Sequence, residues 1–211
     1  MKKLLIKYLL CFAINLFLMQ ILANAQPNKN NVFDTLVAKY GKINSVEVTF
    51  KENDLSEKYN LKAKKGNKFV FNAGKNQIIC NGKTIWNYNY YNKNVVISDF
   101  EPNENIFTLD YFFFNVLSDL QPISLSSQIG NSSKNKTYLL ELQSKDKFSF
   151  IRIVKLTLDE KLKNITSIEI ITNSETYKWI IDNLQFNKNL NDSIFEFTTP
   201  KNIEEIDLRM N

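Results

Sequence analysis

The feature that most constrains this fold is the alternation of aromatic residues within positions 68–100, KFVFNAGKNQIICNGKTIWNYNYYNKNVVISDF. Phe69 and Phe71 lie two positions apart, as do Trp86 and Tyr88. Successive side chains of a strand point to opposite faces, so this spacing places aromatic rings on one face of each strand. Asn-Gly and Asn-Lys turns separate the runs and predict β-hairpins. An aromatic face of this kind suits an apolar ligand, and it equally suits the core of a sandwich or barrel.

The flanking sequence predicts a helix, then strands, then a second helix followed by more strands. Residues 28–41 carry an apolar stripe at helical spacing that ends at Gly41. Residues 102–120 return to helical spacing after Pro102, with aromatic residues around most of the helix circumference. Period-two patterns occupy residues 43–51, 58–64, 138–142, 148–158, 165–171, 176–181 and 194–197. Because no helix pattern separates the later strands, we expect an antiparallel sheet.

The first 25 residues have the pattern of an export signal. A short cationic start precedes an apolar run from Leu4 to Leu22, and Ala23-Asn24-Ala25 has the small-x-small form of a cleavage site. The run is also long enough for a membrane anchor, but its polar residues and its ending favour cleavage after Ala25. Cys11 lies inside the apolar run, where it does not fit a lipid-attachment motif. We therefore expect a signal peptide at 1–25 and one periplasmic domain at 26–211.

The residue types present exclude most catalytic chemistry. The chain has no His, which removes the usual general base and most zinc sites. Cys80 follows two isoleucines, as a buried inert thiol would. Without residues 1–25 the net charge falls from +5 to +2, and only two arginines occur, so a nucleic-acid partner is not expected. The sequence predicts a protein that is not an enzyme and that holds no cofactor or metal.

Two separated segments resemble one family. Residues 81–89, NGKTIWNYN, and residues 94–98, NVVIS, resemble the D-G-K-T-L-W-x-Y segment and following strand of the periplasmic outer-membrane lipoprotein carrier proteins, the LolA family. Residues 193–209, SIFEFTTPKNIEEIDLR, resemble the closing segment of the same family in the form typical of its Bacteroidota-like members. The opening helix and the V-x-V-x-F strand also fit.

The resemblance implies a fold and a function. The fold is α+β and mainly β: an open antiparallel half-barrel of about eleven strands with a helical lid over a concave apolar face. Such a monomer would bind the acyl chains of outer-membrane lipoproteins. It would receive these lipoproteins from an ATP-driven release complex of the inner membrane and pass them to an outer-membrane acceptor or membrane.

The resemblance also implies roles for individual residues. Lys65 matches the basic residue, usually Arg, that closes the lid, although lysine lacks the planar donor fork of arginine. The residues expected in the lipid-binding cavity are Phe50, Phe69, Phe71, Trp86 and Tyr88. The residues expected in the lid are Phe33, Leu36, Phe113, Phe114 and Leu117.

Two other functions stay open from the sequence. The first is transport of another envelope lipid, a glycolipid or a phospholipid. The second is a protein-interaction or sensor domain that uses the same half-barrel. The number of acyl chains that the cavity accommodates would separate the lipid classes, and the sequence does not give it.

Overall fold

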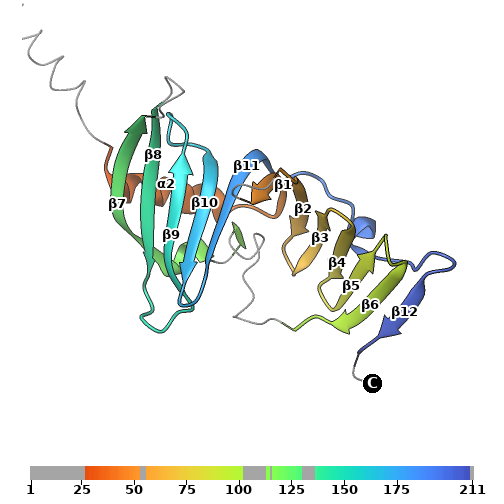
Figure 1. The fold of residues 1–211 in the computed structure, drawn as a ribbon. Coiled ribbons are helices and arrows are strands. Elements are labelled where there is room, and N and C mark those ends of the chain that lie inside the picture. Colours follow the sequence, from red (N-terminus) through yellow and green to blue (C-terminus); the bar gives the residue numbers. More distant parts are fainter. Residues whose placement is uncertain (1–26, 53–55, 102–112, 115, 130–135, 210–211) are drawn as a thin grey trace, which may run out of the picture.

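A computed structural model of the chain describes residues 27–52, 56–101, 113–114, 116–129 and 136–209 (Figure 1). The expected signal peptide and most of the helix expected at 102–120 lie outside these residues. Within the described ranges, no helix combines the length and hydropathy needed to cross a bilayer.

The fold is one twelve-stranded sheet, curved and open (Figure 1). The first half contains β1 (Ser45–Glu52), β2 (Tyr59–Lys64), β3 (Lys68–Ala73), β4 (Asn76–Asn81), β5 (Thr84–Asn89) and β6 (Asn94–Asp99). The second half contains β7 (Leu120–Ile129), β8 (Lys136–Ser144), β9 (Ile151–Leu158), β10 (Ile165–Thr172), β11 (Thr176–Phe186) and β12 (Glu204–Asp207). The spatial order is β12-β6-β5-β4-β3-β2-β1-β11-β10-β9-β8-β7, so β12 and β7 form the two edges.

The open antiparallel sheet agrees with the expectation from sequence, with two differences in detail. The described residues form twelve strands instead of about eleven, and β12 pairs with β6 in parallel, while the other pairs among them are antiparallel. The 17 residues between β11 and β12 carry the chain from the middle of the sheet to the edge formed by β6, where β12 pairs.

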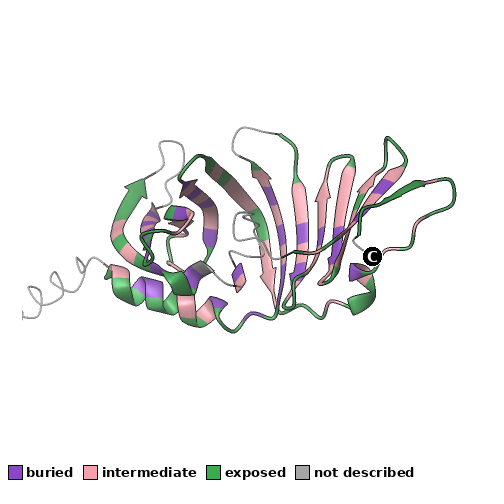
Figure 2. Cartoon of the chain, turned by 90° about the horizontal axis from the view of Figure 1, so that it is seen from below, coloured by how far each residue is buried: buried purple, intermediate pink, exposed green. Residues whose placement is uncertain are grey.

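The helix expected at 28–41 is α2 (Lys29–Tyr40). The side chain of Asn28 accepts a hydrogen bond from the Asn30 N–H at the helix start, as an N-cap residue does. Val32, Phe33, Leu36 and Tyr40 are its buried residues, at helical spacing. Figure 2 shows α2 lying along the β7–β10 part of the sheet.

The expected second helix does not reach its predicted end. Residues 116–119 form a short 3-10 helix, η1 (Val116–Asp119), and Leu120 already begins β7. A strand was likewise expected at 194–197, where the structure has a second 3-10 helix, η2 (Asp192–Phe195). The Asn191 side chain accepts a hydrogen bond from the Ser193 N–H, which favours a helical turn over a strand at this point.

The main core lies on one side of the sheet, between α2 and strands β1, β2 and β8–β10. Leu140, Leu142, Val154, Leu156 and Ile168 are fully buried there. A smaller core lies on the other side of β3 and β4, where Phe195 of η2 packs on Val70 and Ile79. The two sides of the sheet are therefore both apolar, but they are covered by different parts of the chain.

Candidate functional site

The strand register defines which side chains share a face. Phe50 of β1 pairs with Tyr59 of β2 and with Ile181 of β11, and Leu61 of β2 pairs with Phe71 of β3. Directly opposite residues point to the same side of a sheet. All of these residues belong to the main core, on the side where α2 lies. We call this side of the sheet the inner face.

Five aromatic side chains form a continuous row on the inner face across β3, β2, β1 and β11. We call this row the aromatic wall; it consists of Phe71, Tyr59, Phe50, Trp179 and Tyr177. The Phe50 ring centroid lies 5.5 Å from that of Tyr59 and 6.1 Å from that of Phe71. Trp179 lies edge-on to Phe50 at 6.5 Å and stacks on Tyr177 at 5.9 Å. These separations are typical of favourable aromatic pairs.

The aromatic wall is only partly covered. Phe50, in its centre, is buried, whereas Phe71, Tyr59, Trp179 and Tyr177 are half-buried among the described residues. Half-buried rings that touch one another retain apolar surface for an additional contact. The wall is thus a rigid surface, because its rings are fixed by their neighbours, and it is suited to an apolar ligand.

Of the residues expected in the cavity, Phe50, Phe69 and Phe71 lie together on the inner face. Phe69 pairs with Ala63 of β2 and Cys80 of β4, in the same register as Phe71. The structure therefore brings these three together as the sequence predicted. Their role in binding a lipid stays a prediction.

Trp86 and Tyr88 lie on the opposite face, which corrects the expectation of one shared cavity. Cys80 shares the inner face with Phe69 and pairs with Ile85, so the next residue of β5, Trp86, points to the other side. There the Phe197 ring lies 6.5 Å from Trp86 and 5.4 Å from Tyr88. Both residues contribute to the smaller core beneath the C-terminal segment, on what we call the outer face.

The residues expected in the lid are mostly parts of the main core. Phe33 and Leu36 are buried on α2, and Leu117 is buried within η1. Phe113 is 2% exposed, and its ring lies 5.9 Å from Tyr40 and 5.8 Å from Phe186. Phe114 is half-buried against the same core. All five belong to the main core, and their role as a lid stays a prediction.

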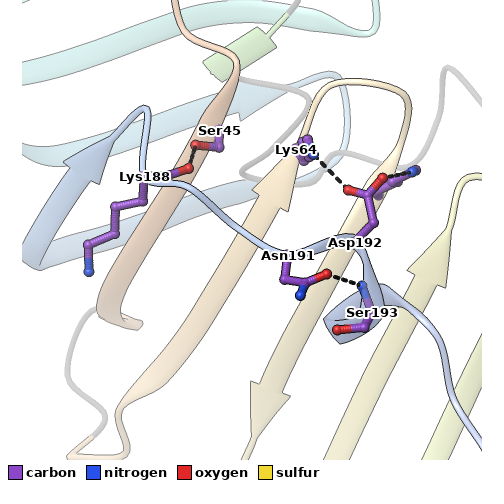
Figure 3. A network of polar contacts seen from close by, with 7 residues as sticks. Ser45, Lys64, Lys188, Asn191, Asp192 and Ser193 are labelled. Atoms are coloured by element: carbon purple, nitrogen blue, oxygen red, sulfur yellow. Dashed lines mark hydrogen bonds and ion pairs between the residues drawn. The ribbon is translucent and has the colours of Figure 1, made fainter.

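Lys65 lies in the exposed turn between β2 and β3. Its backbone N–H donates to the carbonyl of Asn44. The neighbouring Lys64 and Lys68 form ion pairs. Their ammonium groups bind the carboxylate of Asp192, at 2.6 Å and 3.0 Å (Figure 3). The role of Lys65 in lid closure stays a prediction.

The C-terminal segment, residues 187–209, crosses the outer face, and we call it the strap. Ser45 Oγ donates to the Lys188 carbonyl at 2.7 Å, and Asn81 Nδ2 donates to Glu196 at 3.1 Å (Figure 3 shows the former). The hydrogen bonds from Lys64 and then Lys68 lower the pKa of Asp192. The strap is therefore held by both charge and burial of Phe195.

Two further groups have shifted pKa values with clear causes. The hydrogen bond from Lys188 lowers the pKa of Glu47, with a further contribution from Lys62. Burial raises the pKa of Tyr40, which is 2% exposed. Both groups support the fold and neither borders the aromatic wall. Among the described residues, no group of three or more His, Cys, Asp or Glu side chains could hold a metal ion.

Trp179 and Tyr177 are wall residues that the sequence reasoning did not single out. Their strand was expected, but its neighbour was not: β11 lies beside β1, far away in sequence. Alternation within residues 176–181 shows that Tyr177 and Trp179 share a face. Only the long-range pairing shows that this face is that of Phe50.

Residues 41–198 match the sequence profile of the family described as "Outer membrane lipoprotein carrier protein LolA". This region covers the sheet from β1 to β11 together with η2. The chain belongs to the LolA family. An outer-membrane lipoprotein carrier protein of Histophilus somni strain 2336 is 32% identical over 133 residues, which is 63% of this chain and 61% of that relative. The match to this LolA relative thus spans less than two thirds of the relative's length.

Solved structures with a similar fold include proteins from two organisms. A LolA superfamily protein from Nitrosomonas europaea is 12% identical, with 78% of this chain and 97% of that chain covered and a TM-score of 0.37. An uncharacterized conserved protein from Thermus thermophilus is 13% identical, with coverage of 84% and 97% and a TM-score of 0.47.

Proposed function

We propose that this chain is a periplasmic carrier that binds the acyl chains of outer-membrane lipoproteins on its inner face. Membership of the LolA family and the similarity to a lipoprotein carrier protein of Histophilus somni support this function. The single observation that carries it is the aromatic wall, whose rings are fixed by contacts with one another and only half-buried.

The energy of lipid exposure explains why such a surface is needed. Each CH2 group transferred from an apolar environment to water costs about 0.8 kcal/mol, so acyl chains with about 40 methylenes cost roughly 30 kcal/mol to expose. A free lipoprotein would therefore not cross an aqueous compartment. A protein that covers these chains lowers this free-energy cost in proportion to the apolar area that it buries.

The cost of exposing acyl chains to water also indicates which partners such a carrier needs. The chain has no phosphate-binding loop motif, so in our proposal an ATP-driven release complex in the inner membrane supplies the energy for extraction. An acceptor at the outer membrane, or the membrane itself, takes the cargo by binding it more tightly. The signal peptide at 1–25, with cleavage after Ala25, would bring the carrier to the periplasm.

A specific feature of the inner face favours a second candidate, a carrier of a glycolipid. Asn76, Asn89 and Asn94 lie directly opposite one another on β4, β5 and β6. The Asn89 Nδ2 donates to Asn76 Oδ1 at 2.7 Å, and the row stays half-buried. Amide side chains both donate and accept hydrogen bonds, as sugar hydroxyls do. An amphiphile with an uncharged polar head would fit an inner face that is aromatic in one part and amide-lined in the other.

Native mass spectrometry of the protein purified from the periplasm separates the two candidates. A bound acylated protein at one-to-one stoichiometry is expected for the lipoprotein carrier, whereas a bound glycolipid or phospholipid would replace it with the second candidate. If the protein is empty, it is added to spheroplasts that display a labelled lipoprotein. Absence of release in that assay would contradict carriage and favour a protein-interaction domain.

A further inference from the structure

The most exposed large apolar side chain among the described residues is Phe148, at 95%. It lies in the loop between β8 and β9, which extends past the end of the sheet at the bottom of Figure 1. Single exposed apolar residues are common at protein surfaces. What distinguishes Phe148 is the set of hydrogen bonds and charges around it.

Hydrogen bonds fix the loop in the conformation that exposes the ring. The carboxylate of Asp146 accepts from the Phe148 N–H at 2.9 Å, and the Asp146 carbonyl accepts from the Ser149 N–H at 3.3 Å. At the base of the loop, Ser144 Oγ accepts from the Asp146 N–H at 3.2 Å. Exposure of Phe148 is therefore a property of the folded turn, since the backbone on both sides of it is tied down.

Cationic residues flank Phe148 in the sequence. Residues 145–152, KDKFSFIR, contain Lys145, Lys147 and Arg152 against the single carboxylate of Asp146. Arg152 donates to the Lys147 carbonyl at 2.5 Å, and Lys145 Nζ donates to the Ser118 carbonyl at 2.6 Å. The loop thus combines an exposed apolar ring with a local excess of positive charge.

The loop is continuous with the inner face. Phe150, two residues after Phe148, packs against the main core, and Ile151 is buried in it at the start of β9. The loop that carries Phe148 therefore leads directly into β9, whose buried residues belong to the core on the inner face.

We propose that the loop of residues 145–150 docks the protein on an anionic lipid bilayer, with Phe148 inserted at the level of the headgroups. Aromatic rings with neighbouring lysines are favourable at a membrane interface, because the ring enters the apolar boundary while each cation stays beside the anionic phosphates. One ring and about three cations give weak and reversible binding. Reversible docking suits a protein that visits a membrane and leaves it. The consequence for cargo transfer rests on the function proposed above, whereas the docking itself does not.

Vesicle flotation of the purified protein, free of cargo, tests the docking. The vesicles contain phosphatidylcholine alone or phosphatidylcholine with added phosphatidylglycerol. We expect binding to the anionic vesicles, weakened by high salt, and a loss of about tenfold in Phe148→Ser, since most of the apolar contact is removed. Lys147→Gln removes one cation and is expected to weaken binding less.

The matched control is Ile129→Ser. Ile129 is 77% exposed and pairs with Lys136 at the end of β7, whereas the 145–150 loop adjoins the opposite end of the β7–β8 pair. This variant should float like the wild type. In Phe148→Trp, binding should persist and lipids brominated near the headgroup should quench the new indole. Circular dichroism confirms that each variant is folded.

Three results would overturn the docking: no flotation of the wild type with any vesicle, equal flotation of wild type and Phe148→Ser, or equal losses in Phe148→Ser and Ile129→Ser. The first result would leave the loop as a contact for a protein. Capture of a detergent-solubilised lipoprotein in a vesicle-free assay measures the proposed carrier function separately. A carrier that captures cargo but does not float would refute the docking alone.

Discussion

Trp86→Ala and Phe71→Ala together test whether ligand binding belongs to the inner face. The aromatic alternation places both residues in similar sequence patterns, but the strand register places Phe71 in the aromatic wall and Trp86 beneath the strap. We expect Phe71→Ala to weaken binding of an acyl ligand and Trp86→Ala to lower stability with binding unchanged.

The magnitudes follow from the burial of each ring. Full burial of a phenylalanine side chain contributes about 1.5–3 kcal/mol. Phe71 already has part of this contact from Phe50 and Tyr59, so we assign about 1.4 kcal/mol to its contact with ligand, or about tenfold in Kd. Buried Trp→Ala substitutions cost about 3–5 kcal/mol, and because Trp86 is half-buried we expect about 2 kcal/mol in the free energy of unfolding.

The assay uses a fluorescent fatty acyl probe for Kd and urea unfolding, followed by circular dichroism, for stability. Wild type, both single variants and the double variant are compared under the same conditions. In the double variant, the change in Kd and the change in unfolding free energy should each equal the sum of the changes in the two single variants, since the residues lie on opposite faces of the sheet. If Trp86→Ala weakens probe binding as much as Phe71→Ala does, the assignment of the ligand to the inner face is refuted.

Three further substitutions test the packing around this site. Phe113→Asp should prevent stable folding instead of affecting lipid protection alone, because a carboxylate would replace a ring that is 2% exposed. We expect the unfolding free energy to fall by about 4 kcal/mol. A variant that circular dichroism shows to be folded would contradict the burial of this ring. Gly82→Ala should lower the unfolding free energy by about 2 kcal/mol. The reason is that Gly82 has a φ of +93° and that a Cβ there would lie 2.5 Å from the Gly66 carbonyl oxygen. An unchanged urea midpoint would refute this prediction. Asp192→Asn should lower stability at neutral pH. The folded pKa of Asp192 lies below its ordinary 3.8, so the unfolded state binds more protons and the stabilisation is lost as the pH falls below 3.8 through the folded pKa. Unfolding curves at several pH values should therefore converge for wild type and Asp192→Asn at low pH, and a constant difference would exclude this ion pair as the cause.

Much of the sheet could be predicted from local sequence because its hairpins are short. For β1, β2, β3, β5 and β6 the period-two patterns predicted the strands, and the turns at Gly74-Lys75 and Gly82-Lys83 each join adjacent strands by two residues. The same two-residue turns also determine the register. Counting across them pairs Phe69 with Cys80 and Cys80 with Ile85, so the sequence already contained the signal that Trp86 lies on the other face.

β7 and β12, which the sequence reasoning did not predict, have a strand pattern or a pairing that is not local. Pro122 lies within β7, where it argues against a strand, but β7 is an edge strand with a register shift between Pro122 and Ser124. β12 is a run of acidic residues around Ile206, and it becomes a strand by pairing with β6. Trp179 likewise lies in the aromatic wall because β11 pairs with β1, and no short-range sequence pattern predicts that pairing.

The separation of the two cores explains how the aromatic wall can stay available to a ligand. Most of the fully buried apolar residues lie on β8–β10, β1 and α2, so the stability of the fold does not depend on complete burial of Tyr59, Phe71 and Trp179. On the other side of β3–β6, the strap covers the apolar residues that would otherwise compete with the wall for an acyl chain. In the carrier that we propose, an acyl chain would meet the aromatic wall, because the strap occupies the apolar surface on the other side of the described sheet. Loosening the strap, as in Asp192→Asn, should therefore add nonspecific acyl binding without changing the affinity of the wall.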